Sequence, residues 1–208
     1  MISTEIAQGF ATFTLARPEK ANSLTGRMLQ ELCDAVDRVA QDPDLRVLTL
    51  TGQGGVFSAG ADLDEARAGL ALSPLWEQLS ARIAALPCLT IAALNGTVAG
   101  GALGMVLACD LRIAVPSAKI FYPVMKLGFL PQPSDAVRMS ALIGPARARM
   151  ILMAGQKIPA PEALARGLVD RLVEPGELMA AARELGADAM GASLDHVKGI
   201  KGLIPAGI

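Results

Sequence analysis

The sequence predicts a single α/β domain in which helices cover a mainly parallel sheet. Strand-like segments alternate along the chain with segments of helical periodicity, which is the pattern of this class. The 208 residues suffice for one good-sized core and are few for two. Apolar residues make up 52% of the chain and charged residues 19%, which argues against disorder, collagen and coiled coil.

The first quarter of the chain contains two predicted strands around one helix. Residues 10–15 alternate with period two and predict a half-buried strand. A turn over 17–22 leads to apolar residues at helical spacing between 26 and 40. Residues 47–51 predict a second strand, and a glycine-rich loop follows over 52–60.

The middle of the chain repeats this alternation. Ser73 and Pro74 predict the start of a helix, with proline at its first position, that ends before Pro87. A strand over 88–94, a buried helix over 101–108 and a strand over 111–115 then follow. Beyond Ser134 the pattern is mostly helical, with breaks at 144–145, 159–161 and 175–176.

Charge and composition limit the partners and the compartment. The net charge is −1 and aromatic residues are 3%, so we expect no nucleic-acid partner. Three cysteines without CxxC spacing argue against disulfides and zinc knuckles and favour a reducing compartment, the cytoplasm. His196 is the one histidine, which removes most His-based metal sites, and we expect no metal.

One apolar run is long enough to suggest a membrane span. No charge occurs in the 27 residues between Arg82 and Asp110, which exceeds the roughly 18-residue threshold for a transmembrane helix. Pro87, the Asn95-Gly96 turn and three later glycines divide the run into a strand-like half and a helix-like half. We therefore expect a buried strand-turn-helix and no membrane association, and the N-terminus shows no secretory signal.

Two loops with small residues follow predicted strands, at 56–63 and 95–102. The second opens directly into a helix, whose first N–H groups are unpaired and attract an oxygen that becomes negative. Two such donors facing one point would form an oxyanion hole. From the chemistry alone, the simpler interpretation is that the glycines allow close packing of helix against strand.

Two other motifs lie close to these loops and both are incomplete. Residues 99–104 miss the first glycine of GxGxxG, and no acid follows about twenty residues later, which argues against a dinucleotide fold. Residues 56–60 are one glycine short of GxSxG, and only His196 could serve Ser58 as a base.

Four ordered segments resemble the crotonase superfamily of enoyl-CoA hydratases and isomerases. They are 17–24, 57–63, 95–114 and 163–169, and the resemblance covers roughly residues 4–175. It implies a crotonase-like spiral of ββα units, usually a homotrimer or dimer of trimers, that binds an acyl-CoA thioester as substrate. It implies no separate cofactor, because coenzyme A is part of the substrate.

The resemblance also assigns backbone groups. The oxyanion-hole donors would be the N–H groups of Ala61 and Gly101, which shifts the interpretation of the two loops from packing to function. Lys20 could otherwise be an ordinary solvated lysine. The full set of residues expected to line the acyl-CoA site is Lys20, Ala21, Ala59, Gly60, Ala61, Asp62, Leu63, Gly100, Gly101, Gly104 and Val124.

The two catalytic glutamates of family hydratases are absent. Gly104 and Val124 stand at the positions where the resemblance places them, and between Glu77 and Asp135 the only acid is Asp110, which we expect to be structural. Each well-placed acid or base contributes a factor of about 10²–10⁴, so we expect little ordinary hydratase activity.

Other side chains could supply the acid or base. Asp135 is a candidate, although it could equally be a first-turn helix residue that favours the dipole. Tyr122 could donate a proton or only cap a pocket, whereas Asp64 and Glu65 are expected to be solvated. Gln132 lies where some relatives carry an aspartate and could orient a polar group, but it cannot titrate.

The expected organisation is an acyl-CoA-binding core over 1–175 and a short helical tail over 176–208, with helices at 177–190 and 192–203. Family members usually have a longer C-terminal helical region, and His196 on this tail is expected at the surface. Three functions remain open. They are an enolate-stabilising acyl-CoA enzyme with an atypical acid/base, a non-catalytic acyl-CoA-binding subunit, and a hydrolase that uses Ser58.

Overall fold

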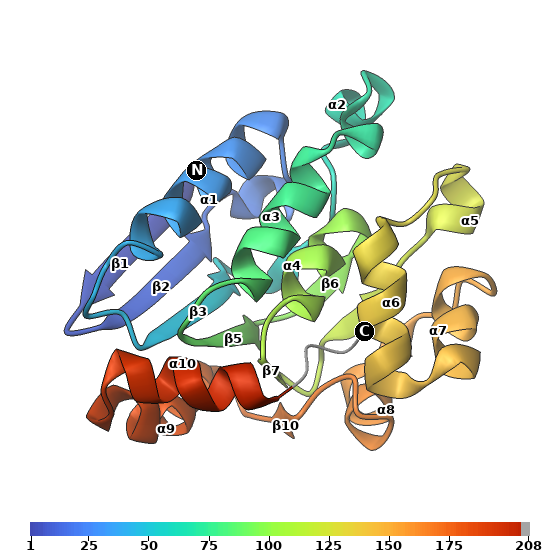
Figure 1. Cartoon of the computed structure of the whole chain (residues 1–208). Helices are drawn as coiled ribbons and strands as arrows, with labels where there is room; N and C mark the ends of the chain where they lie inside the picture. Colours follow the sequence, from blue (N-terminus) through green and yellow to red (C-terminus); the bar gives the residue numbers. More distant parts are fainter. Residues whose placement is uncertain (205–208) are drawn as a thin grey trace.

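A six-stranded sheet forms the centre of the molecule (Figure 1). The computed structural model describes residues 1–204. Strand β1 pairs antiparallel with β2, and every other pair in this sheet is parallel. In spatial order the strands are β1 (Ile2–Ala7), β2 (Phe10–Leu15), β3 (Val47–Gly52), β5 (Leu89–Leu94), β7 (Leu111–Ala114) and β10 (Arg171–Leu172).

A second, four-stranded sheet lies beside the first and explains the repeat of the fold. Three successive strand pairs, β3/β4, β5/β6 and β7/β8, each give their first strand to the large sheet and their second to the small one, and helices follow each pair. The predicted spiral of ββα units is thereby confirmed. The small sheet contains β4 (Val56–Ser58), β6 (Thr97–Ala99), β8 (Lys119–Phe121) and β9 (Ile158–Pro159).

Helices cover the large sheet on both sides. Figure 1 shows α1 and α3 on one side and α9 and α10 on the other, and α9 contacts β3, β5 and β7. The α-helices are α1 (Gly26–Val39), α2 (Leu63–Arg67), α3 (Leu75–Ala84), α4 (Leu103–Leu107), α5 (Val124–Leu127), α6 (Pro133–Ile143), α7 (Pro145–Leu152), α8 (Ala160–Ala165), α9 (Leu178–Gly191) and α10 (Leu194–Leu203). The 3₁₀ helices are η1 (Pro18–Lys20), η2 (Leu70–Leu72), η3 (Gly100–Ala102) and η4 (Pro175–Glu177).

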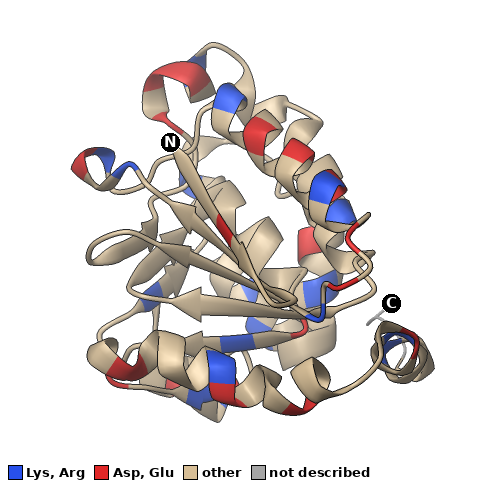
Figure 2. Ribbon diagram, turned by 90° about the vertical axis from the view of Figure 1, so that its left-hand side faces the viewer, with Lys and Arg blue, Asp and Glu red and all other residues tan. Residues whose placement is uncertain are grey.

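The distribution of apolar residues follows this layering. All six residues of β3 are buried, as expected for a parallel strand covered on both faces. Helix α1 turns one apolar face inward, and Thr25 Oγ1 accepts a hydrogen bond from Met28 N at 3.1 Å to cap its first turn. Figure 2 shows that Lys, Arg, Asp and Glu lie mostly on helices and loops and are sparse on the strands.

Several elements differ from the sequence-based prediction. The loop predicted over 52–60 contains β4, and β6 separates the Asn95-Gly96 turn from η3. Each of these strands has three residues, which is too short for a period-two pattern to be recognised. Helix α3 begins at Leu75, with Pro74 as its N-cap residue. The predicted tail helices are present as α9 and α10, while residues 205–208 of the tail lie outside the described residues.

The uncharged run over 83–109 folds as the end of α3, then β5, β6, η3 and α4. Within residues 1–204, no helix combines the length and apolar character that a membrane crossing requires. Cys33, Cys88 and Cys109 are all buried, and none of them forms a disulfide in this structure.

Candidate functional site

The loop between β4 and α2 is held by the segment that follows η1. Leu24 N donates to Gly60 O and Asp62 N donates to Leu24 O, both at 2.8 Å, which makes a parallel bridge between Leu24 and Ala61. In such a bridge the N–H of the middle residue points away from its partner strand. No hydrogen bond found within residues 1–204 uses the Ala61 N–H.

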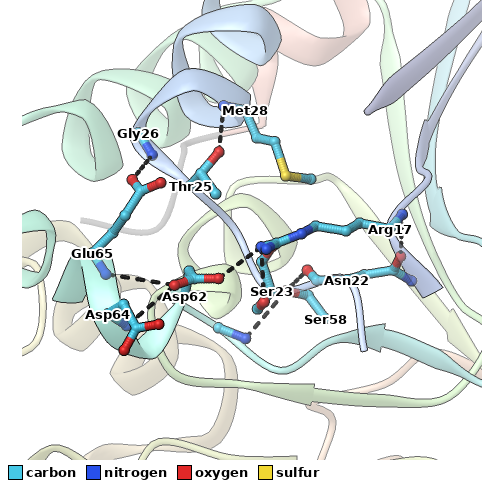
Figure 3. A network of polar contacts seen from close by, with 11 residues as sticks. Arg17, Asn22, Ser23, Thr25, Gly26, Met28, Ser58, Asp62, Asp64 and Glu65 are labelled. Carbon is cyan, nitrogen blue, oxygen red and sulfur yellow. Dashed lines mark hydrogen bonds and ion pairs between the residues drawn. The ribbon is translucent and has the colours of Figure 1, made fainter. Parts of the chain in front are cut away.

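An ion pair fixes the same loop from the other side (Figure 3). Arg17 Nη1 donates to Asp62 Oδ2 at 2.8 Å and to Ser23 O at 3.1 Å. Asp62 Oδ1 accepts from Asp64 N at 3.1 Å and so caps the start of α2. The hydrogen bond from Arg17 holds the pKa of the Asp62 carboxyl below its usual range. Asp62 therefore stays ionised, and its ion pair with Arg17 holds the loop next to the segment that follows β2.

Asn22 and Ser58 complete this network (Figure 3). Asn22 Nδ2 donates to Val56 O at 2.7 Å and to Gln53 O at 2.9 Å. Ser58 Oγ donates to Asn22 O at 2.8 Å and accepts from Gly60 N at 3.1 Å. The Ser58 hydroxyl therefore already makes two hydrogen bonds inside the protein, and the residue is fully buried. His196, the one histidine that could have served it as a base, is exposed on α10. These contacts argue against Ser58 as a nucleophile.

The second glycine-rich loop touches the first. A Cβ placed on Gly60, whose φ is +94°, would lie 2.8 Å from Ala99 O and 3.5 Å from Gly100 Cα. Glycine at position 60 is therefore required both by its backbone conformation and by the close approach of the next strand. Ala61 and Gly101 are the residues that follow the two glycines in contact. The structure thus brings the two predicted amide donors to neighbouring turns.

Gly101 is the second residue of η3, and the first amides of a helix have no partner inside it. The indole of Trp76 on α3 packs against this glycine, because a Cβ placed on Gly101 would lie 3.0 Å from Trp76 Cε3. Trp76 is 4% exposed, and its Nε1–H donates to Leu70 O at 2.8 Å. A buried aromatic ring therefore forms the wall next to the Gly101 amide.

Asp135 reaches the space beside Gly104. A Cβ placed on Gly104 would lie 2.9 Å from Asp135 Oδ1, so the carboxyl of α6 fills the volume that a side chain on α4 would need. Tyr122 donates its hydroxyl to Asp135 Oδ2 at 3.0 Å. Asp135 Oδ1 is buried and has no hydrogen-bond partner within residues 1–204. The first-turn position predicted for Asp135 is confirmed, and its side chain points inward.

Burial changes how Asp135 titrates. Asp135 is completely buried, and loss of solvation raises the pKa of its carboxyl to about 7, with the negative charge of Glu77 acting in the same direction. The Tyr122 hydrogen bond, which is the second-largest influence after burial, and the charge of Arg138 act in the opposite direction. Burial and the Asp135 charge also raise the pKa of Tyr122 above its ordinary range. Asp135 can therefore gain or lose a proton near neutral pH, whereas Tyr122 stays a donor.

The remaining predicted site residues lie around these loops with different exposures. Val124 is buried at the start of α5, so an apolar side chain stands where the resemblance places the second glutamate. Lys20 is exposed on η1, and Ala21 follows it in the left-handed region with φ of +50°. Ala59 and Leu63 are exposed, whereas Gly100 is half-buried.

Other reactive groups are accounted for elsewhere. Asp110 accepts hydrogen bonds from Thr90 N, Thr90 Oγ1 and Lys201 Nζ at 2.7–2.9 Å, which supports its predicted structural role. Burial raises the pKa of the Cys88 and Cys109 thiols to about 12, so they are not thiolates at neutral pH. Within residues 1–204, no group of three or more Asp, Glu, His or Cys is arranged to hold a metal ion.

Sequence reasoning missed two side chains of this region, Trp76 and Glu77. Both lie on α3, whose apolar spacing placed it in the core but gave no sign that it faces the second glycine-rich loop. In the sequence, these two residues stand between Leu75 and Leu79, beside the aliphatic row, and no spacing relates them to the glycine-rich loops.

Comparison with known proteins identifies the family of this chain. A family model described as enoyl-CoA hydratase/isomerase matches residues 5–207 of the chain. The chain belongs to the enoyl-CoA hydratase/isomerase family. The crotonase superfamily resemblance is therefore confirmed.

Several known proteins are similar to most of this chain in sequence, and a solved structure is similar to it in fold. YngF of Bacillus subtilis, named for an enoyl-CoA hydratase/isomerase, is 38% identical over 184 residues, which are 85% of this chain and 70% of that protein. The 4-chlorobenzoyl coenzyme A dehalogenase-1 of an Arthrobacter species is 32% identical over 208 residues, 96% of this chain and 75% of the dehalogenase. The crystal structure of an enoyl-CoA hydratase from Bacillus anthracis has a TM-score of 0.90 and 32% identity, covering 97% of this chain and 81% of that one.

Proposed function

We propose that this family member acts on an acyl-CoA thioester by moving a proton at the carbon next to the thioester carbonyl, with Asp135 as the acid/base. The observation that carries the proposal is the Asp135 carboxyl in the space beside Gly104, the position at which the resemblance to family hydratases places a glutamate. In this chain, a carboxyl from α6 would take the place of one on α4.

In the proposed mechanism, the thioester oxygen accepts hydrogen bonds from the Ala61 and Gly101 amides. Ionised Asp135 removes a proton from the α-carbon, and the resulting negative charge moves to the thioester oxygen. Each amide donor lowers the barrier by about 3–4 kcal/mol in sites of this type. A proton acceptor that titrates near the working pH is the most effective one, and Asp135 meets this condition.

This arrangement favours double-bond isomerisation over hydration. For a 3-enoyl thioester, Asp135 would take the proton from C2 and return it to C4, so that the double bond moves to C2–C3 and no other group is consumed. Hydration requires a second group that deprotonates water. Val124 is apolar, and Tyr122 already donates its hydroxyl to Asp135.

Two assays test this proposal. We expect the protein to exchange the α-protons of butyryl-CoA with D₂O, followed by NMR, and to convert 3-hexenoyl-CoA to the 2-enoyl isomer. Asp135→Asn should reduce both rates by about 10²-fold or more, whereas its binding of butyryl-CoA, measured by calorimetry, should be unchanged. Asp188→Asn, at an exposed position on α9, is the matched control.

Other results would point elsewhere. Binding of butyryl-CoA without exchange or turnover by the wild-type protein would favour a non-catalytic acyl-CoA-binding subunit. Full activity of Asp135→Asn would show that another group moves the proton.

We further propose a homotrimeric assembly and a cytoplasmic location. Support for assembly comes from exposed apolar side chains on and around α5, α6 and α7, at Met125, Leu127, Leu130, Val137, Met150 and Met153. Three unpaired cysteines fit a reducing compartment. Sedimentation equilibrium tests the first proposal and cell fractionation the second, and a monomer or a membrane-bound pool would contradict them.

A further inference from the structure

Helix α6 begins without a side-chain cap of its own. Its N-cap residue, Gln132, makes no capping hydrogen bond, and Pro133 follows at the first helical position. The free amides of a first turn carry partial positive charge and are stabilised by a nearby anion. Asp135 occupies this turn, but its carboxyl points into the interior toward Gly104. The first turn of α6 can therefore take a hydrogen-bond acceptor from another element.

Glu77 on α3 supplies that contact. Its Oε2 lies 3.5 Å from Ser134 N, the amide directly before Asp135. One helical turn later on α3, Ser80 Oγ lies 3.4 Å from Ser134 Oγ, which also accepts a hydrogen bond from Arg138 at 2.9 Å. One face of α3 thus holds the residue next to Asp135 by both its backbone and its side chain.

The charges around the buried Asp135 carboxyl come from three elements. Tyr122 before α5 donates a hydrogen bond to it, Arg138 lies one turn further along α6, and Glu77 approaches from α3. Gly104, its neighbour on α4, carries no charge. Glu77 is therefore the negative group that opposes ionisation of Asp135.

We propose that Glu77 is a positioning residue for Asp135. Its carboxylate, 3.5 Å from Ser134 N, holds the first turn of α6 and places a negative charge next to the residue that carries the proposed acid/base. The effect of this role on catalysis rests on the proposed function of Asp135. The contact of Glu77 with Ser134 N and the effect of the Glu77 charge on Asp135 do not depend on that function. Glu77 would make Asp135 a proton donor over a wider pH range than burial alone allows.

A titration without substrate tests this role. The protein is labelled with [4-¹³C]aspartate, and the Asp135 signal is assigned by its absence in Asp135→Asn. In Glu77→Gln, the amide oxygen can still accept from Ser134 N while the charge is lost, so we expect the Asp135 midpoint to move to lower pH. Glu77→Asp keeps the charge and should leave the midpoint near that of the wild type.

The control variant is Glu184→Gln, which removes an equal charge from an exposed site on α9. An unchanged Asp135 midpoint in Glu77→Gln, or an equal shift in Glu184→Gln, would overturn the role of Glu77. If the proposed function also holds, the pH profile of α-proton exchange moves in the same direction as the midpoint. A midpoint that moves without any exchange activity would refute the proposed function and leave the positioning role intact.

Discussion

Replacing Asp135 by asparagine should change how the stability of the protein depends on pH. Well below pH 3.8, the Asp135 carboxyl carries a proton in both the folded and the unfolded chain. As the pH rises, the unfolded chain loses this proton near the ordinary value of 3.8, while the folded chain keeps it until about pH 7. Ionisation therefore lowers the free energy of the unfolded state across this interval, and the free energy of unfolding of the wild-type protein decreases.

The size of the effect follows from the two pKa values. A rise from 3.8 to about 7 corresponds to about 4 kcal/mol, at about 1.4 kcal/mol for each unit. Asparagine cannot titrate, so the stability of Asp135→Asn relative to the wild type should increase by about 4 kcal/mol between pH 4 and pH 8. Other titrating groups act equally on both proteins and cancel in the difference.

Urea unfolding at fixed protein concentration, repeated at several pH values, measures this difference directly. Asp188→Asn is the control, since it makes the same substitution on the surface. A difference that stays constant from pH 4 to pH 8 would show that Asp135 is already ionised in the folded protein at low pH. The assignment of Asp135 as an acid/base near neutral pH would then be wrong.

Three further substitutions test the supports of the site. Gly60→Ala should lower the free energy of unfolding by about 2 kcal/mol or more, because it forces an unfavourable positive φ and a Cβ contact with Ala99 O. It should also slow α-proton exchange about 10²-fold, because it displaces the first loop. Normal exchange activity would show that the loop contact is not needed. Ser58→Ala should lower the free energy of unfolding in urea by about 1–3 kcal/mol, since the buried Gly60 amide loses its acceptor. Labelling of the wild type at Ser58 by a fluorophosphonate would instead support the hydrolase hypothesis. Lys201→Met should cost about 1–2 kcal/mol, because the bond from α10 to Asp110 is lost, and an unchanged unfolding midpoint would contradict this role.

Much of the fold could be predicted from sequence because its longer elements repeat clear patterns. Residues 11–15 of β2 alternate, and α1 presents an apolar face at helical spacing, so the bounds of both were predicted almost to the residue. The prediction that β2 is half-buried was wrong, because nearly all of its residues are buried between neighbouring layers. The three-residue strands β4, β6 and β8 could not be recognised, because their backbones are stabilised by pairing with distant segments. Such pairing leaves little trace in the local sequence.

The candidate site was likewise predictable from the sequence only in part. The glycine-rich loops were visible as motifs, since close backbone approach at Gly60 requires glycine. The inward orientation of Asp135 could not be predicted, because it depends on the space left by Gly104 more than thirty residues earlier. Glu77 was equally hidden, since its contact with Ser134 joins two helices that the sequence does not relate.

The contact between Gly104 and Asp135 restricts the order in which these two positions can change over time. A sequence with side chains at both positions would place two groups in one volume, since even a Cβ at 104 comes within 2.9 Å of the carboxyl oxygen. A sequence with a side chain at neither would leave an empty space in the interior, which is also unfavourable. The two positions are therefore coupled, because a side chain at 104 is accommodated only if the Asp135 carboxyl moves or is replaced by a smaller group.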